Sequence, residues 1–261
     1  MALKRKKGAV RPRALVTGGA GDIGLATAIR LQQDGWLVGL VDLDGAAVAR
    51  AARRARGAVG IAADVTDEAS CAAAVEEFGP IDLLVNNAGI GRFAPLHLLP
   101  VADFRKVVEV NLVGQYVMAR TCVQGMIARG RGVIVNVTSI NAITPGPGSG
   151  AYPAAKAGLA RLTEQMALEW GPLGIRTNAV APGFVDGGLS TPFFRDPAVR
   201  SLRSGAVPLR RLGTCADVAE AIAFLASDRA SYINGHQLVV DGGVAPSLLV
   251  QLPREARSPG K

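Results

Sequence analysis

The sequence has little of what several common kinds of functional site require. Only two histidines, His97 and His236, occur in 261 residues, which leaves little material for a histidine-based metal site or a Ser-His-Asp triad. The three cysteines, Cys71, Cys122 and Cys215, are odd in number and far apart, and none stands in a CxxC pair. We therefore expect no metal site, and we interpret the cysteines as reduced thiols of a cytoplasmic protein.

Long apolar runs are also missing. No run of about eighteen apolar residues occurs, so no membrane span is expected. No charged-then-apolar leader with a small-residue cleavage site stands at the start, so secretion is not expected. A chain of this length, 49% hydrophobic, fits one large domain with a sizeable core better than two small ones.

The formal net charge of +8 is concentrated in the two ends of the chain. Residues 1–13 hold six basic residues and no acidic one, and residues 254–261 hold three basic residues and one acidic one. The part between them is formally neutral, so we do not expect nucleic acid as a partner. We interpret 1–13 as a disordered basic tail, 14–246 as the folded domain and 247–261 as a C-terminal tail. Weak contact of the basic tail with a polyanion is the alternative.

Short apolar segments without polar alternation are typical of strands buried on both faces of a parallel sheet. Helical stretches lie between most of them, which predicts an α/β fold, a single-domain Rossmann-type doubly wound sheet of about seven strands with helices on both faces. The expected strands are 14–17, 37–42, 59–63, 83–86, 133–138, 176–181 and 237–240, and the expected helices are 23–34, 45–56, 68–78, 101–129, 152–170 and 216–227. Helix ends are expected near glycines 35, 57, 79, 130 and 171, and Asp67 and Asp217 near helix starts. The irregular segments 145–150 and 187–208 are expected to be loops that set substrate specificity.

A glycine-rich segment, T-G-G-A-G-D-I-G at 17–24, joins the first expected strand to a helix. Glycine permits a tight turn and a close backbone approach to a pyrophosphate, and a helix N-terminus favours negative charge. The second strand ends at Asp42, whose carboxylate can accept hydrogen bonds from an adenosine ribose and would repel a 2′-phosphate. No Arg or Lys stands beside it, so NAD is expected in preference to NADP. Asp42 could instead, or in addition, cap the next helix.

Several motifs, in order and each at the end of an expected strand, resemble those of the short-chain dehydrogenase/reductase family in its single-domain form. They are the segment 17–24, Asp64-Val65, Asn86-Asn87-Ala88-Gly89 and Pro182-Gly183, and the resemblance spans 14–243. It implies cofactor contacts from Gly18, Gly21, Asp22, Ile23, Gly24, Asp42, Leu43, Asp64, Val65, Asn87, Ala88, Gly89, Tyr152, Lys156, Pro182, Gly183 and Val185. Two positions depart from the family pattern. Asp22 replaces a glycine, and Gly187 replaces a threonine that often holds the nicotinamide carboxamide, a role that Ser190 or Thr191 could take.

Tyr152 and Lys156 are four residues apart at the start of an expected helix, so both side chains lie on one face. A lone pattern of this kind also fits an ordinary amphipathic helix. With Ser139 at the end of the fifth strand and Asn111 in a helix, it resembles the family's catalytic tetrad. The resemblance implies that Tyr152 is the general acid/base, Ser139 binds the substrate oxygen, Lys156 holds the nicotinamide ribose and lowers the pKa of Tyr152, and Asn111 carries a water-linked proton relay.

The function expected from these residues is NAD(H)-dependent interconversion of a secondary alcohol and a ketone. A non-catalytic dinucleotide-binding regulator, an NADP-dependent 3-oxoacyl-thioester reductase and a dehydratase or epimerase are the alternatives. The sequence does not identify the substrate. An apolar pocket could be formed by Phe93, Ile143, Phe184, Phe193 and Phe194, and polar groups could be held by Arg92 and Asn141. The family resemblance also implies a homotetramer packed through 101–129 and 152–170, and 152–170 carries an apolar stripe at Ala155, Leu159, Leu162, Met166 and Leu168.

Overall fold

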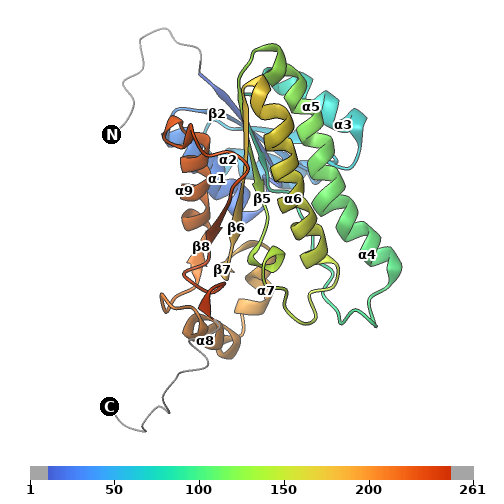
Figure 1. Cartoon of the computed structure of the whole chain (residues 1–261), viewed down its shortest axis with the longest axis vertical. Helices are drawn as coiled ribbons and strands as arrows, with labels where there is room; N and C mark the ends of the chain where they lie inside the picture. Colours follow the sequence, from blue (N-terminus) through green and yellow to red (C-terminus); the bar gives the residue numbers. More distant parts are fainter. Residues whose placement is uncertain (1–10, 248–261) are drawn as a thin grey trace.

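The computed structural model describes residues 11–247, in which seven parallel strands form one sheet with helices on both faces (Figure 1). The order across this sheet is β3 (Val59–Ala62), β2 (Leu37–Asp42), β1 (Arg13–Thr17), β4 (Leu83–Asn86), β5 (Gly132–Val137), β6 (Ile175–Pro182) and β9 (Gln237–Val240). The expected α/β, doubly wound, single-domain fold is confirmed. The direction of winding reverses between β1 and β4, which is the point of such a sheet where ligands bind.

The core lies on both sides of the sheet because neighbouring strand residues point to opposite faces. On β1, Ala14 and Val16 pack in a cluster with residues of α1, α2 and α9, whereas Leu15 packs in a second cluster with α3, α5 and α6. Figure 1 shows these two helix layers. The helices are α1 (Asp22–Gln33), α2 (Gly45–Arg54), α3 (Glu68–Phe78), α4 (Val101–Val108), α5 (Gly114–Ala128), α6 (Tyr152–Trp170), α7 (Thr191–Phe194), α8 (Pro197–Ala206) and α9 (Cys215–Ala226). The expectation of strands buried on both faces therefore holds for β1, β2, β4, β5 and β6, whereas the edge strands β3 and β9 are largely exposed or half-buried.

The N-terminal boundary lies slightly earlier than expected. β1 begins at Arg13, and the guanidinium of Arg11 donates to the carbonyls of Gly35 and Trp36 at 3.2 and 2.8 Å. Specific contacts therefore reach residue 11. Residues 1–10 and 248–261 of the expected tails lie outside the described residues.

The chain is helical without a break over 101–128, close to the helix expected over 101–129, but this stretch is not one regular α-helix. α4 and α5 are separated by a wider π-helical turn, Glu109–Val113. In this turn the side-chain amide of Asn111 donates to the carbonyl of Val107 at 2.9 Å, and that of Gln115 donates to the carbonyl of Val110 at 3.0 Å. These side-chain donors satisfy carbonyls in the widened turn, so the interruption is tolerated in the interior.

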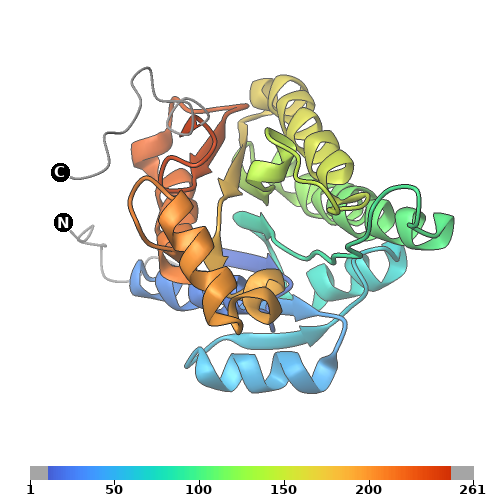
Figure 2. The same cartoon turned by 90° about the horizontal axis from the view of Figure 1, so that it is seen from below.

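The segment expected to be irregular, 187–208, contains α7 and α8, and a short pair of strands, β7 (Val185–Asp186) and β8 (Gly213–Thr214), lies beside it. Asp196 caps α8 by accepting a hydrogen bond from the amide of Ala198 at 2.8 Å, and Pro197 takes the first helical position. α7 and α8, coloured orange, lie toward the viewer in Figure 2, at the end of the sheet where the strands terminate.

The alternative that Asp42 caps the helix after β2 is wrong. Asp44, and not Asp42, caps α2 by accepting from the amide of Ala47 at 2.9 Å. The expected helix-start roles of Asp67 on α3 and Asp217 on α9 are confirmed. The expected helix end near Gly171 is confirmed, because α6 ends at Trp170 and Gly171 is its C-cap residue. A 3-10 turn follows, and the left-handed glycine after it is Gly174.

Two further observations concern the same described residues. No helix in 11–247 has the length and apolar character needed to cross a bilayer. Cys71, Cys122 and Cys215 are all free thiols, and burial raises the pKa of Cys71 and of Cys215 to about 11.

Candidate active site

A cavity of about 910 Å³ opens at the carboxyl ends of the strands. Its wall includes residues that end or follow β1, β2, β4, β5 and β6, and residues of α7 and α8 close its other side. The cavity thus spans the switch point between β1 and β4, where the glycine-rich turn also lies.

The glycine-rich turn is packed too tightly for side chains. Gly18 has φ of +62°, and a Cβ there would lie 2.8 Å from the Cα of Ala88. A Cβ on Gly24 would lie 2.3 Å from the carbonyl oxygen of Gly18. Gly21 is the N-cap residue of α1 and provides no side-chain cap, and Gly21, Asp22 and Ile23 line the cavity. Uncapped amides at a helix start, reached over bare backbone, fit a dinucleotide pyrophosphate.

Asp42 lines the same end of the cavity. Its Oδ2 accepts a hydrogen bond from the amide of Ala20 at 3.0 Å, which ties the end of β2 to the glycine-rich turn. Its second oxygen has no hydrogen bond within the described residues. A carboxylate fixed by one oxygen and open at the other suits a ribose hydroxyl, so the residues present fit an adenosine dinucleotide here.

Hydrogen bonds of Thr17 hold the ends of β1 and β4 together. The Oγ1 of Thr17 accepts from the amides of Asn87 and Ala88, each at 3.0 Å. The side chain of Asn87 donates back to the carbonyls of Thr17 and Gly18 at 3.0 and 3.1 Å. One layer deeper, Asn86 donates to Asn136 on β5 at 2.9 Å. The N-N-A-G segment therefore shapes the floor of the cofactor end.

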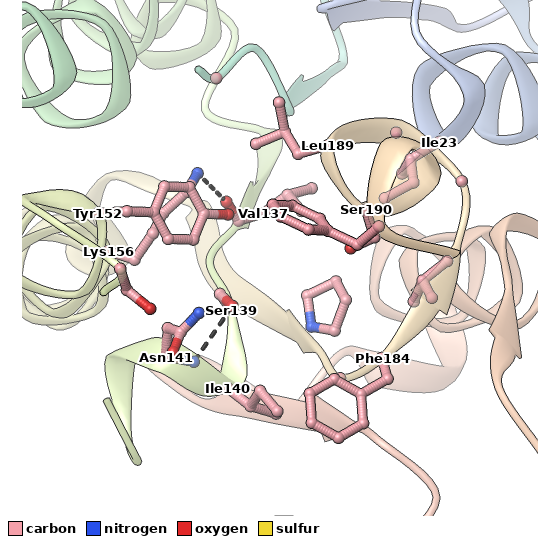
Figure 3. A pocket seen from close by; sticks show the side chains of 18 of the residues that line it. Ile23, Val137, Ser139, Ile140, Asn141, Tyr152, Lys156, Phe184, Leu189 and Ser190 are labelled. Carbon is pink, nitrogen blue, oxygen red and sulfur yellow. Dashed lines mark hydrogen bonds between the residues drawn. The ribbon is translucent and has the colours of Figure 1, made fainter. Parts of the chain in front are cut away.

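Tyr152, Lys156 and Ser139 converge on the other part of the cavity (Figure 3). Tyr152 begins α6, and Lys156 follows one turn later with only 2% of its surface exposed. The Nζ of Lys156 donates to the carbonyl of Val137 at 2.7 Å and lies 5.7 Å from the centroid of the Tyr152 ring. Ser139, at the end of β5, accepts from the amide of Asn141 at 3.1 Å. The strand end and the helix start thus place a phenol, a hydroxyl and an amine together.

Burial dominates the proton affinities of this group. It raises the pKa of Tyr152 to about 12, although a hydrogen bond with Ser139 acts in the opposite direction. It lowers the pKa of Lys156 to about 7, because the ammonium loses its hydration. The expected lowering of the Tyr152 pKa by Lys156 is therefore not found in the protein alone. Tyr152 is held in its protonated form, the form that donates a proton to a carbonyl oxygen.

Comparison with known proteins gives this geometry a family. A family model described as Enoyl-(Acyl carrier protein) reductase matches residues 18–245. Cis-4-hydroxycyclohexanecarboxylate dehydrogenase of Sinomonas cyclohexanicum is 46% identical over 238 residues, covering 88% of this chain and 95% of that protein. A crystal structure of a short chain dehydrogenase/reductase from Burkholderia thailandensis matches with a TM-score of 0.89 at 36% identity, covering 94% of this chain and 96% of that one. A crystal structure of NAD+-bound xylitol dehydrogenase matches with a TM-score of 0.84 at 34% identity, covering 89% of this chain and 98% of that one.

The chain belongs to the short-chain dehydrogenase/reductase family. It is an oxidoreductase that acts on CH–OH groups of a small-molecule substrate with NAD(P) as the cofactor. The alternative of a non-catalytic regulator is not favoured.

As a short-chain dehydrogenase/reductase, the chain places most of its motif residues on the cavity wall, but not all. The wall contains Gly18, Gly21, Asp22, Ile23, Asp42, Asn87, Gly89, Ser139, Tyr152, Lys156, Pro182, Gly183 and Val185. It does not contain Gly24, Leu43, Asp64, Val65, Ala88 or Asn111. Gly24 and Ala88 act instead through the close packing of the turn, and the side chain of Leu43 is 72% exposed.

Asp64 and Val65 have structural partners of their own. The carboxylate of Asp64 accepts from the amide and the hydroxyl of Thr66 at 2.8 and 2.7 Å, and these bonds hold its pKa below the usual range. Val65 is buried and packs against Gly114 at the start of α5. Their family role beside the adenine ring stays a prediction.

Asn111 lies behind the wall, fully buried. Its side-chain nitrogen donates to the carbonyls of Ile90 and Val107, both at 2.9 Å, while its Oδ1 has no partner within the described residues. A Cβ on Gly89 would lie 2.6 Å from that oxygen and 3.7 Å from the Nζ of Lys156. Asn111 and Lys156 therefore approach the same bare glycine, and the proton relay stays a prediction.

The part of the cavity nearest Tyr152 is aromatic. Phe93 makes edge contacts with Tyr152 and Phe193, at 6.2 and 5.5 Å between ring centroids, and Phe184 and Phe194 also line the wall. Asn141 lines the cavity as suggested, whereas Ile143 and Arg92 do not, and Arg92 instead approaches Asp103 at 3.7 Å. The sequence reasoning missed Arg203 of α8, because α8 was expected to be a loop.

Proposed function

We propose that this chain is an NAD(H)-dependent dehydrogenase that interconverts a secondary alcohol and a ketone, with Tyr152 as the general acid/base. The observation that carries this proposal is the convergence of Tyr152, Ser139 and Lys156 at one part of a cavity whose other end has the uncapped start of α1 and Asp42. An arrangement with no acid/base group at the reacting end would suit a sensor instead.

The chain's own residues account for the proton. Bound NAD(H) would supply the hydride acceptor or donor. Tyr152 is protonated at neutral pH, as a phenol ordinarily is, and its burial raises its pKa further. It donates this proton to a ketone oxygen during reduction and takes it back during oxidation. Ser139 is placed to hydrogen-bond the same substrate oxygen. In the oxidative direction Tyr152 must lose its proton, and a protonated Lys156 favours that loss through its positive charge.

Asp42 supports NAD over NADP. Its open oxygen suits a ribose hydroxyl, and its charge would oppose a 2′-phosphate. Leu43, which follows it, offers no positive charge to offset that repulsion. The NADP-dependent 3-oxoacyl-thioester reductase is for this reason the second candidate.

An apolar, ring-shaped alcohol is the substrate class that the wall favours. Phe93 lies against Tyr152, Phe193 lies against Phe93, and Phe184 and Phe194 also line the cavity. The 46% identical relative is named for a hydroxylated cyclohexane ring, which supports the same choice. The test is a screen of cyclic secondary alcohols and polyols with NAD+ and NADP+, followed by absorbance of the reduced nicotinamide. Oxidation of polyols alone would overturn the ring preference, and activity with NADP+ alone would favour the second candidate.

A homotetramer stays part of the proposal, on partly different residues. Ala155, Leu159 and Met166 of α6 are buried within the subunit, so they are not available to a second copy, whereas Leu168 is 74% exposed. The better support is on the exposed faces of α4 and α5 and the turn between them, which carry Val101, Phe104, Val113 and Tyr116. Sedimentation velocity at micromolar concentration should give a mass four times that of one chain. Val113→Glu should lower this mass, whereas Leu202→Glu on α8 should leave it unchanged. A monomer in the unmodified protein would contradict the proposal.

Two further parts of the proposal rest on sequence. The catalytic domain extends to residue 246 and, with the contacts of Arg11, begins at residue 11 instead of 14. The free thiols suit a cytoplasmic location.

A further inference from the structure

Among the described residues, four charged side chains line the cavity: Asp22, Asp42, Lys156 and Arg203. The first three have partners inside the protein, since Asp42 accepts from Ala20, Asp22 accepts from Gly188 and Lys156 donates to Val137. The guanidinium of Arg203 makes no hydrogen bond or ion pair within residues 11–247. A cavity with one uncommitted cation is expected to receive an anion there.

The guanidinium of Arg203 nevertheless has one contact inside the cavity. Its Cζ lies over the Phe184 ring, 4.7 Å from the centroid, which is a cation–π contact. Such a contact uses none of the N–H donors of a guanidinium. In Figure 3, Phe184 lies across the cavity from Tyr152, with Ser139 between them. Arg203 thus lies on the Phe184 side of the cavity, opposite the reacting hydroxyl.

The helix that carries Arg203 is anchored by a second arginine. Arg200, one turn earlier on α8, binds Asp186 with two hydrogen bonds of 2.8 Å each and donates to the carbonyl of Phe194 at 3.1 Å. The Asp196 cap fixes the start of the same helix. The two arginines of α8 therefore differ in their surroundings, because Arg200 has a carboxylate partner within the protein and Arg203 has none.

We propose that Arg203 binds a carboxylate of the substrate, which makes the substrate a hydroxy acid with its hydroxyl and its carboxylate at opposite ends of an apolar body. The rings of Phe93, Phe184 and Phe193, which line the same cavity, offer apolar surface to that body. Although Arg203 is an exposed residue, a planar carboxylate matches the paired donors of a guanidinium edge, and such charge-assisted bonds are stronger than neutral ones. This inference rests on the proposed function, because it extends the same cavity.

The test separates binding from turnover by using two rings that carry no hydroxyl. Cyclohexanecarboxylate and cyclohexanecarboxamide have the same shape, and only the first is charged. Calorimetric titration of each into the NAD+-loaded protein should show the carboxylate binding about 10- to 100-fold more tightly. Arg203→Met should remove that difference and leave the carboxamide within about 3-fold of its original affinity. Arg203→Lys should keep part of it, since an ammonium is a point charge without the paired geometry.

Arg229→Met is the matched control. Arg229 stacks on Phe224 at 5.6 Å, in the same kind of contact but outside the cavity, so this change should leave both affinities unaltered. Equal binding of the two rings by the unmodified protein, or the same loss for both in Arg203→Met, overturns the proposal. A weaker affinity for NAD+ in Arg203→Met, with the ring preference intact, assigns Arg203 to the cofactor instead. These titrations measure binding and not turnover. A negative result here is therefore distinct from a failure of the proposed dehydrogenase activity, which the Tyr152→Phe variant tests.

Discussion

The carboxylate of Asp22 accepts a hydrogen bond from the amide of Gly188 at 2.8 Å, which joins the first turn of α1 to a loop 166 residues later in the chain. A Cβ on Gly187 would lie 3.4 Å from the Cβ of Asp22 and 2.4 Å from the Sγ of Cys215. A threonine at 187 would therefore require a shift of its neighbours. The two positions at which this chain departs from the family motifs are thus neighbours in space and act as one feature, a tether between the cofactor turn and the loop before α7.

Asp22→Ala should loosen this tether. Loss of an exposed, charge-assisted hydrogen bond of about 1 kcal/mol predicts a rise of about 3- to 10-fold in the KM for substrate, with a smaller change in kcat. Asp22→Asn keeps an oxygen that can accept from Gly188 and removes a negative charge beside the pyrophosphate site. It should therefore lower the KM for NAD+ and leave the KM for substrate nearly unchanged. Steady-state kinetics measure both, with Glu68→Gln on α3 as the control. A parallel rise of both KM values in the two variants would contradict the tether.

Tyr152→Phe should keep the ring packing with Phe93 and remove the group that exchanges the proton. We expect kcat/KM to fall by about 10²- to 10⁴-fold, the range for loss of a general acid/base, with little change in NAD+ affinity. Tyr232→Phe, at a fully exposed tyrosine outside the cavity, should have no effect. Turnover close to that of the unmodified protein in Tyr152→Phe would rule out the assigned role.

Local patterns were sufficient to predict the elements that the sheet itself requires. Leu15 and Val16 on β1 pack on opposite faces, and a strand buried on both sides must be apolar throughout, so the sequence shows it. The cofactor turn was equally readable, because a Cβ at Gly18 or Gly24 would collide with backbone and only glycine satisfies the turn.

Other features depend on contacts between segments that no local pattern describes. The π-helical turn depends on where Asn111 and Gln115 send their side-chain amides. The direction in which the pKa of Tyr152 shifts depends on how much water the fold removes from the phenol, and residue spacing does not show this. The start of α8, in contrast, has a local signal. Asp196 followed by Pro197 is a typical N-cap pair, so the sequence alone is sufficient to predict a helix start there.

Lys156 should make stability depend on pH above neutrality. Burial lowers its pKa in the folded protein to about 7, from an ordinary value of 10.5. Between these two values the unfolded chain binds more protons than the folded chain, so the contribution of Lys156 to the free energy of unfolding rises with pH. We expect this rise between pH 7.5 and about 8.5, below the ordinary pKa values of cysteine and tyrosine.

Urea unfolding without added dinucleotide measures this slope. Lys156→Met should lack the rise, and Lys106→Met, at an exposed lysine on α4, should keep it. Equal slopes in the unmodified protein and in Lys156→Met would show that Lys156 is charged in the folded state, and that the carbonyl of Val137 is sufficient to stabilise its ammonium.

Asp42 should set the choice of cofactor. With NAD its free oxygen gains hydrogen bonds from the adenosine ribose, each contributing about 1.5–3 kcal/mol, and with NADP it would lose them and face a phosphate of the same sign. Preference for NAD should therefore reach at least about a hundredfold in kcat/KM, or about 2.7 kcal/mol. The unmodified protein using NADP as well as NAD would show that this carboxylate does not contact the ribose.

Three variants separate the two functions of Asp42, the bond to Ala20 and the negative charge. Asp42→Asn keeps an acceptor for the Ala20 amide and removes the charge. It should therefore reduce the preference for NAD over NADP while leaving the glycine-rich turn in place. Asp42→Ala removes both, and it should also weaken use of either cofactor because the turn loses its bond to β2. Adding Leu43→Arg to Asp42→Ala should move the preference toward NADP, since a guanidinium pairs well with a phosphate and position 43 is exposed beside the site. Asp44→Ala is the control, because it removes the cap of α2 without touching the cavity, and it should reduce stability with an unchanged ratio of NAD to NADP activity.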